Sequence, residues 1–177
     1  IGASAFQGKS ITAVVIPDTI VEVKNNAFHT TALTEITIPG SVMTIGDSAF
    51  WSCKSLKRAV LEDGVETIGK SAFAESNALS SVSMPESLRT IDDAAFDRCF
   101  PLDVKIPNGV ETIGQSAFNY CNIFTELVIP DSVTSIGNSA FGNCSKLISV
   151  TIPNSVTAFG EHIFVGCSNL VSAVFED

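Results

Sequence analysis

The chain has 177 residues, of which 45% are hydrophobic and 16% charged, so it is long enough for one domain with a substantial core. Ten Lys and Arg against 19 Asp and Glu give a net charge of −9, which excludes the basic surface that nucleic acids and anionic lipids require. No apolar run approaches the roughly 20 residues of a membrane span, and the first residues lack the charged-then-apolar pattern of a signal peptide.

A phenylalanine, usually preceded by alanine, recurs along the whole chain. Large apolar residues stand five positions before it and five or six positions after it in almost every copy. Such a period is typical of a solenoid, in which each unit buries its apolar face against its neighbours. Successive copies are 22 or 23 residues apart, at Phe6, Phe28, Phe50, Phe73, Phe96, Phe118, Phe141 and Phe164.

The stretch before the proline of each copy predicts a β-strand. In one copy, Val150 and Ile152 alternate with Ser149 and Thr151, which is the period of a strand with one buried face. Pro153 then ends the strand, because proline has no N–H to donate to a ladder. Equivalent strands of successive copies are expected to stack in parallel, about 4.8 Å apart.

The rest of each copy predicts a corner, a short extended return and a tight turn. Residues 155–160 form the extended piece, and the glycine at its end, which recurs in six of the eight copies, is expected to supply a corner with positive φ. Polar residues ahead of Phe141, followed by apolar residues at three-residue spacing up to Leu147, predict one capped helical or 3₁₀ turn.

The copies differ in length at two places. The first two have one residue fewer between the phenylalanine and the next apolar position, and the copy after Phe96 has one fewer between Leu102 and Val104. The chain starts inside a copy and stops just after a strand, without the polar capping repeat that solenoid ends need. We therefore expect residues 1–177 to be one solenoid domain and a fragment of a longer protein.

The repeat resembles a known family. Residues 130–147 match at every position the pattern Pro-x-Ser-Val-Thr-x-Ile-Gly-x-Ser-Ala-Phe-x-x-Cys-x-x-Leu of the BspA-like, Treponema-type leucine-rich repeats, and seven looser copies cover the remainder. The resemblance implies a mostly β leucine-rich-repeat solenoid with parallel stacked strands, short helical turns and about eight repeats of 22–23 residues. It also implies a large secreted or cell-surface protein that adheres to host matrix proteins or to other microbes.

The residues that usually carry chemistry are few. The cysteines all stand three positions after a repeat phenylalanine, and this spacing matches no zinc motif, so we interpret them as buried thiols that act as small hydrophobes. His29 and His162 are several coils apart, and neither pairs with a recognisable nucleophile. We expect no catalytic residue, metal or cofactor. The five thiols are Cys53, Cys99, Cys121, Cys144 and Cys167.

The outward positions of the predicted strands form two columns, on what we expect to be the concave sheet. These columns are compatible with an ordinary solvated sheet. They are also compatible with a ligand-binding platform, because a rigid solenoid offers an extended surface to partners. Trp51 and Tyr120 lie outside the repeat core and are candidate aromatic anchors. The candidate partner-binding residues on the sheet are Glu35, Thr37, Arg58, Val60, Asp103, Lys105, Glu126 and Val128.

Three functions are compatible with these features. The leading hypothesis is a non-enzymatic protein-interaction domain of a cell-surface or secreted protein, used in adhesion, with a matrix protein, a microbial surface protein or a glycan as the partner. The alternative is an intracellular scaffold. The third is a β-helix-type enzyme that degrades polysaccharides, for which Asp103, Glu126 and Lys105 are the candidates because column spacing places the two acids side by side.

Overall fold

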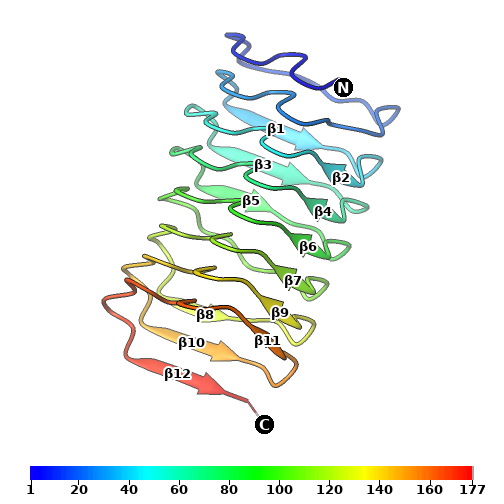
Figure 1. Ribbon diagram of the computed structural model, residues 1–177. Coiled ribbons are helices and arrows are strands. Elements are labelled where there is room, and N and C mark those ends of the chain that lie inside the picture. Colours follow the sequence, from blue (N-terminus) through cyan, green and yellow to red (C-terminus); the bar gives the residue numbers. More distant parts are fainter. Residues whose placement is uncertain (177) are drawn as a thin grey trace.

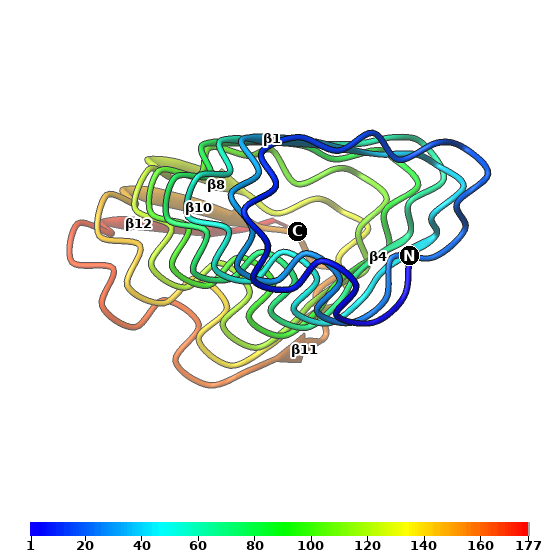
Figure 2. The ribbon, with the colours of Figure 1, turned by 90° about the horizontal axis from the view of Figure 1, so that it is seen from above.

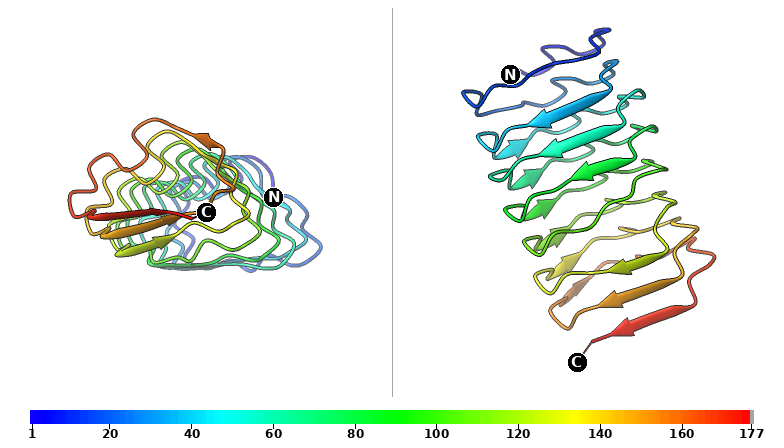
Figure 3. Two further views of the ribbon diagram at one scale, coloured as in Figure 1. Left: turned by 90° about the horizontal axis from the view of Figure 1, so that it is seen from below. Right: turned by 180° about the vertical axis from the view of Figure 1, so that it is seen from behind.

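A repeating coil with one longer and one shorter β-strand builds the molecule. The computed structural model describes residues 1–176, and the coils stack into a rod with the two termini at opposite ends (Figures 1 and 3). The longer strands are β1 (Glu35–Ile38), β3 (Arg58–Leu61), β5 (Ser81–Ser83), β8 (Glu126–Val128), β10 (Ser149–Ile152) and β12 (Ser172–Phe175). The shorter strands are β2 (Thr44–Ile45), β4 (Thr67–Ile68), β6 (Thr90–Ile91), β7 (Thr112–Ile113), β9 (Ser135–Ile136) and β11 (Ala158–Phe159).

All strand pairing is parallel, as the repeat predicts. The shorter strands form one continuous sheet in the order β11-β9-β7-β6-β4-β2. The longer strands form two separate sheets, β1-β3-β5 and β12-β10-β8, which together make up what we call the long-strand face. A view from above shows the coils lying over one another, with the two sets of strands on different sides (Figure 2).

The phenylalanine column is the centre of the core. Neighbouring rings stack with centroids 5.2–5.9 Å apart and planes within 14° of each other, in an unbroken series from Phe6 to Phe164. The six inner rings are completely buried. Offset stacking at this separation is a favoured aromatic geometry. The rise from one coil to the next therefore places equivalent phenylalanine rings at a favourable stacking distance.

The prediction of a short helical turn beside each phenylalanine is wrong. No helix forms in residues 1–176, and hence none in this part of the chain could span a bilayer. In the coil of Phe50, Ser48 and Ser52 have left-handed backbones, with φ of 53° at each. The N–H groups of these three residues donate to carbonyls of the next coil, at 2.7–2.8 Å. The N–H groups of Ala49 and Trp51 donate within the segment, so bonds to the next coil alternate with local bonds and the continuous series of a helix does not form.

The role predicted for the recurring glycine is also wrong. The glycines with positive φ in residues 1–176 are Gly8, Gly64 and Gly166, and none of them belongs to that column. Space requires the column glycines instead, except Gly2, whose Cβ would meet nothing within 4 Å. A Cβ on Gly137 would lie 2.4 Å from the backbone nitrogen of Gln115, one coil away. A side chain at this corner would push two coils apart.

The expected count of about eight repeats exceeds the number of coils with strands. Eight phenylalanines stack, but each side of the described solenoid carries six strands. The first coil has no strand at residues 12–16, and the coil at residues 103–106 has only the isolated bridge between Ser81 and Asp103. The solenoid therefore has about six complete turns.

Candidate binding surface

The long-strand face carries the two predicted columns of outward side chains. Glu35, Arg58 and Ser81 are successive partners in the first sheet, and Glu126 pairs with Ser149 in the second. In β1 and β3 the side chains alternate between exposed or half-buried and buried. Because all outward residues of a strand share one face, the columns form a surface that several coils build together. The predicted concavity of this face stays a prediction.

A groove at the start of this face brings together four of the predicted residues. Glu35, Thr37, Arg58 and Val60 line a hollow of about 330 Å³, and Val15, which is 90% exposed, closes it on the side of the first coil. The first coil forms no strand beside β1, and the hollow lies where residues 14–16 face β1 and β3. Its lining combines valine and isoleucine side chains with the exposed carboxylate of Glu35 and the exposed guanidinium of Arg58.

A second groove of about 330 Å³ lies further along the same face, between residues 104–108 and β8. Lys105, Glu126 and Val128 line it, and all three are exposed. Among the ion pairs within 4 Å in residues 1–176, none involves Lys105, Glu126 or Asp103. We call this hollow the β8 groove.

No strand pairing joins Asp103 to Glu126, and their predicted proximity stays a prediction. Asp103 bridges Ser81 on the N-terminal side, while Glu126 belongs to β8, which pairs only with β10. The missing residue between Leu102 and Val104 interrupts the sheet at this point. The alignment of repeats predicts neighbouring side chains only if every coil forms its long strand. The coil that contains Asp103 does not form one.

Trp51 and Tyr120 lie in turn segments, and neither lines the two grooves of the long-strand face. The Trp51 ring stacks on His29, with centroids 4.7 Å apart and planes 16° from parallel. Tyr120 packs edge-on against Phe100, and the guanidinium carbon of Arg98 lies 5.3 Å from the centre of its ring. Both aromatic side chains are half-buried and already have partners within the chain.

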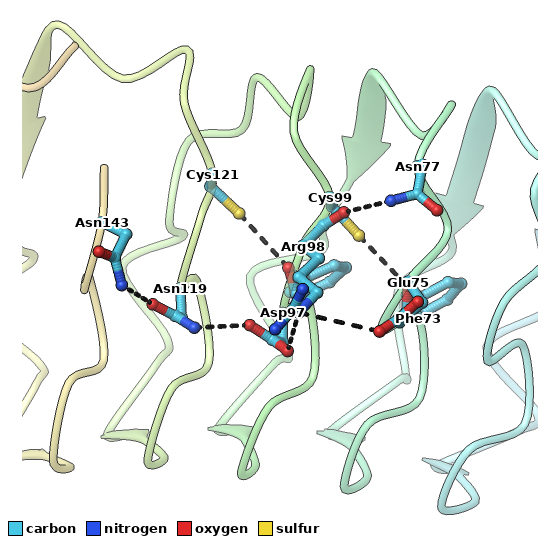
Figure 4. Close-up of polar contacts among 10 residues, drawn as sticks. Phe73, Glu75, Asn77, Asp97, Arg98, Cys99, Asn119, Cys121 and Asn143 are labelled. Atoms are coloured by element: carbon cyan, nitrogen blue, oxygen red, sulfur yellow. Dashed lines mark hydrogen bonds and ion pairs between the residues drawn. The ribbon is translucent and has the colours of Figure 1, made fainter. Parts of the chain in front are cut away.

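A polar cluster around Arg98 was not found from the sequence (Figure 4). The Arg98 Nε atom lies 3.5 Å from a carboxylate oxygen of Asp97 and 3.8 Å from one of Glu75. Asn119 donates to Asp97 at 2.8 Å, and Asn143 donates in turn to Asn119 at 3.0 Å. Partial burial raises the pKa of the Asp97 carboxyl, although the hydrogen bond from Asn119 and the charge of Arg98 act in the opposite direction. The residues one and two positions after the phenylalanine thus form polar ladders from coil to coil. Their shared position in the repeat is the sequence signal from which this cluster could have been predicted.

The cysteine column is buried, as predicted. Each Sγ donates to the carbonyl of a repeat phenylalanine, for example Cys99 to Phe73 at 3.2 Å and Cys121 to Phe96 at 3.4 Å. All five thiols are free, and Cys167 is half-buried where the other four are fully buried. Burial raises the pKa of the Cys99 and Cys121 thiols well above the ordinary value, so these side chains stay protonated and act as small apolar donors.

The side chains that could bind a metal or act as nucleophiles are dispersed in the described part of the chain. No cluster of three or more His, Cys, Asp and Glu side chains suited to a metal ion lies within residues 1–176. His29 belongs to the Trp51 stack and His162 is exposed. A parallel solenoid with a phenylalanine-centred core and an exposed strand face defines a leucine-rich-repeat type of protein.

The comparisons with known proteins agree with that class. The chain belongs to the BspA-type leucine-rich repeat family, whose model matches residues 1–123 and 102–177 with six copies of the repeat. The family is one of leucine-rich-repeat protein-interaction domains. No curated protein sequence matches the chain.

Three solved structures of bacterial proteins are similar. A leucine-rich repeat protein of Bacteroides ovatus is 29% identical, with a TM-score of 0.85 over 99% of this chain and 52% of its own. The Treponema pallidum leucine rich repeat protein is 30% identical, with a TM-score of 0.71 over 80% of this chain and 69% of its own. A leucine rich cell surface protein of Faecalibacterium prausnitzii is 32% identical, with a TM-score of 0.75 over 88% of this chain and 43% of its own. The chain thus spans about half the length of the Bacteroides protein.

Proposed function

We propose that this chain is a non-enzymatic interaction domain of a cell-surface or secreted protein, and that it takes part in adhesion to host or microbial partners. The observation that carries the proposal is the long-strand face, which presents unpaired charged, hydroxyl and apolar side chains over six strands with two grooves. A rigid, extended surface of this kind is what repeat proteins use to bind other proteins. The surface description of the Faecalibacterium relative supports the location.

The mechanism is the addition of many modest contacts. A protein of the extracellular matrix or of another microbial surface lies along several coils, and simultaneous contacts raise the overall affinity above that of any one of them. A glycan is the alternative ligand for the same face. The absence of a paired strand joining Asp103 to Glu126 supports a binding role over polysaccharide cleavage, because no shared sheet holds the two carboxylates in a fixed arrangement.

The location is tested on intact source cells. The cells are treated with a protease that cannot cross the membrane and are probed with an antibody against this domain, with a cytosolic protein as the control. Loss of the domain while the control survives is expected. Survival of the domain until lysis would refute the adhesion proposal and favour the intracellular scaffold.

The binding face is tested with the purified chain on a panel of immobilised extracellular matrix proteins. The Glu35→Lys, Arg58→Glu double variant exchanges two charges on the long-strand face without changing the net charge, and we expect it to weaken binding. Glu22→Lys with Lys24→Glu is the matched control. Those two residues flank Val23 on the short-strand side and form an ion pair of 3.2 Å, which survives the exchange. Equal binding by both variants would exclude the groove at β1 as the contact.

A further inference from the structure

The interruption of the long-strand face has a local cause. In the other coils, one residue separates the buried leucine or phenylalanine of the column from the first outward residue of the strand, as Thr125 does between Phe124 and Glu126. The carbonyl of this linking residue accepts hydrogen bonds from the next coil, and Thr125 accepts from Ser149. Leu102 is followed directly by Asp103, so this coil has no such carbonyl to offer to β8.

The result is an open strand edge inside the solenoid. Leu127 and its neighbours bond to β10, as the contacts from Ser149 to Thr125 and from Ile129 to Thr151 show. In a parallel ladder the alternate residues bond to the other side. The N–H and C=O groups of Glu126 and Val128 therefore face the β8 groove, and no hydrogen bond within residues 1–176 engages them. Figure 1 shows no arrow between β5 and β8 on the long-strand face.

The groove beside this edge has the size and lining of a binding site. Its 330 Å³ lies at the lower end of the range for ligand pockets. Val104, Ile106 and Leu127 supply apolar walls, and Val128 is 67% exposed at the rim. Glu126 adds an exposed carboxylate on the strand itself, without an ion-pair partner.

We propose that the β8 groove binds an extended segment of a partner protein by strand addition. This inference rests on the proposed function and names the kind of partner that the face takes. Four backbone groups at strand spacing are complemented by the backbone of another extended chain, since it alternates donors and acceptors at the same interval. A glycan lacks that interval.

Side chains on β8 define the preferred sequence of the segment. Residues two apart on the added strand lie beside Glu126 and Val128, which share one face of the sheet. A basic residue is favoured beside Glu126, and a β-branched or aromatic residue beside Val128. The ligand is therefore an extended segment with a basic and an apolar residue two positions apart, and the net charge of −9 favours a basic segment at longer range.

Amide hydrogen exchange tests the open edge directly. In the free chain, the amides of Glu126 and Val128 are expected to exchange fast and that of Leu127, which bonds to β10, slowly. A blocked Thr-Lys-Thr-Val-Thr-Val peptide at saturation should slow the first two about tenfold, the effect of one or two added hydrogen bonds, and leave Leu127 unchanged. The same peptide with methylated backbone nitrogens should not protect them.

Variants separate strand addition from general contact. Insertion of one serine between Leu102 and Asp103 restores the linking carbonyl, and it is expected to close the edge and reduce peptide affinity at least about tenfold while the chain stays folded. Glu126→Lys tests the side-chain preference. Thr151→Lys is the matched control, because it lies in the same outward column as Val128 but on β10, which is paired on both sides.

Several outcomes would overturn the proposal. Protected Glu126 and Val128 amides in the free chain at low concentration would show that the edge is closed. Protection that rises with protein concentration alone would assign the edge to a second copy. Unchanged peptide binding by the insertion variant would place the ligand elsewhere. None of these outcomes bears on the cell-surface protease experiment, so this inference and the proposed function can fail separately.

Discussion

Replacement of Phe96 by alanine is the most direct test of the phenylalanine column. The ring is fully buried and stacks on Phe73 and on Phe118, with centroids 5.4 Å away on each side. Removing a buried phenylalanine side chain costs about 3–5 kcal/mol, through lost transfer energy and the cavity left behind. Each stacked pair adds about 0.5–1.5 kcal/mol. We therefore expect Phe96→Ala to reduce the free energy of unfolding by about 5 kcal/mol, because stacked coils cannot collapse into the gap.

Two further variants separate stacking from burial. Phe96→Leu keeps most of the apolar volume but loses both stacked neighbours, so a loss of about 1–3 kcal/mol is expected. Phe6→Ala removes a ring that is only half-buried and has one stacked neighbour, Phe28. Its expected cost is about 1–2 kcal/mol. Phe96→Ala is therefore expected to cost the most of the three variants.

Urea unfolding measures these changes by circular dichroism and by the fluorescence of Trp51, the single tryptophan. The two probes are expected to report one transition in the natural chain, because the column couples the coils. A loss below about 2 kcal/mol for Phe96→Ala, or a loss equal to that of Phe6→Ala, would refute the view that the stack is the main source of cohesion.

Four other measurements test the described contacts. Gly137→Ala should cost about 2–3 kcal/mol in urea unfolding, because its Cβ would meet backbone of the preceding coil, whereas Gly2→Ala, with nothing within 4 Å, should be neutral. Burial raises the pKa of Asp97 and disfavours its charged form in the folded state, so stability falls as pH rises through the unfolded and then the folded pKa. Asp97→Asn should therefore gain stability relative to the natural chain over that rise in pH. The Lys70 ammonium lowers the pKa of Asp93, so Asp93→Asn should be less stable than the natural chain near pH 7, with the difference disappearing as pH falls through the folded pKa. A thiol reagent should modify Cys167 alone in the folded chain and all five cysteines in urea.

The parts of the fold that repeat could be predicted from the sequence. Val150 and Ile152 are buried and Ser149 and Thr151 half-exposed, as the alternation in that stretch indicated. One such pattern would be weak on its own, but eight aligned copies make it specific. The phenylalanine column identified the core for the same reason, since only a residue that contacts its own copy in the next coil has to recur at this interval.

The turn beside the phenylalanine could not be predicted in the same way. Ser48 and Ser52 suit a helix cap by residue type, yet both adopt left-handed backbones. The choice is made by the next coil, whose carbonyls accept the N–H groups of Ser48, Phe50 and Ser52. A pattern within one copy carries no information about hydrogen bonds between copies.

The β8 groove shows the effect of one missing residue. The shortened stretch after Leu102 is visible in the sequence, but its consequence appears on the next coil, where Glu126 loses its acceptor. In a solenoid each coil supplies the hydrogen-bond partners of its neighbour. A residue missing from one coil therefore leaves backbone groups of the next coil without partners. The core continues unbroken through the same coils, because Phe96, Phe118 and Phe141 still stack. A strand edge can therefore open on the face of the solenoid without loss of the fold, and departures from the repeat length are the places to look for binding sites in this chain.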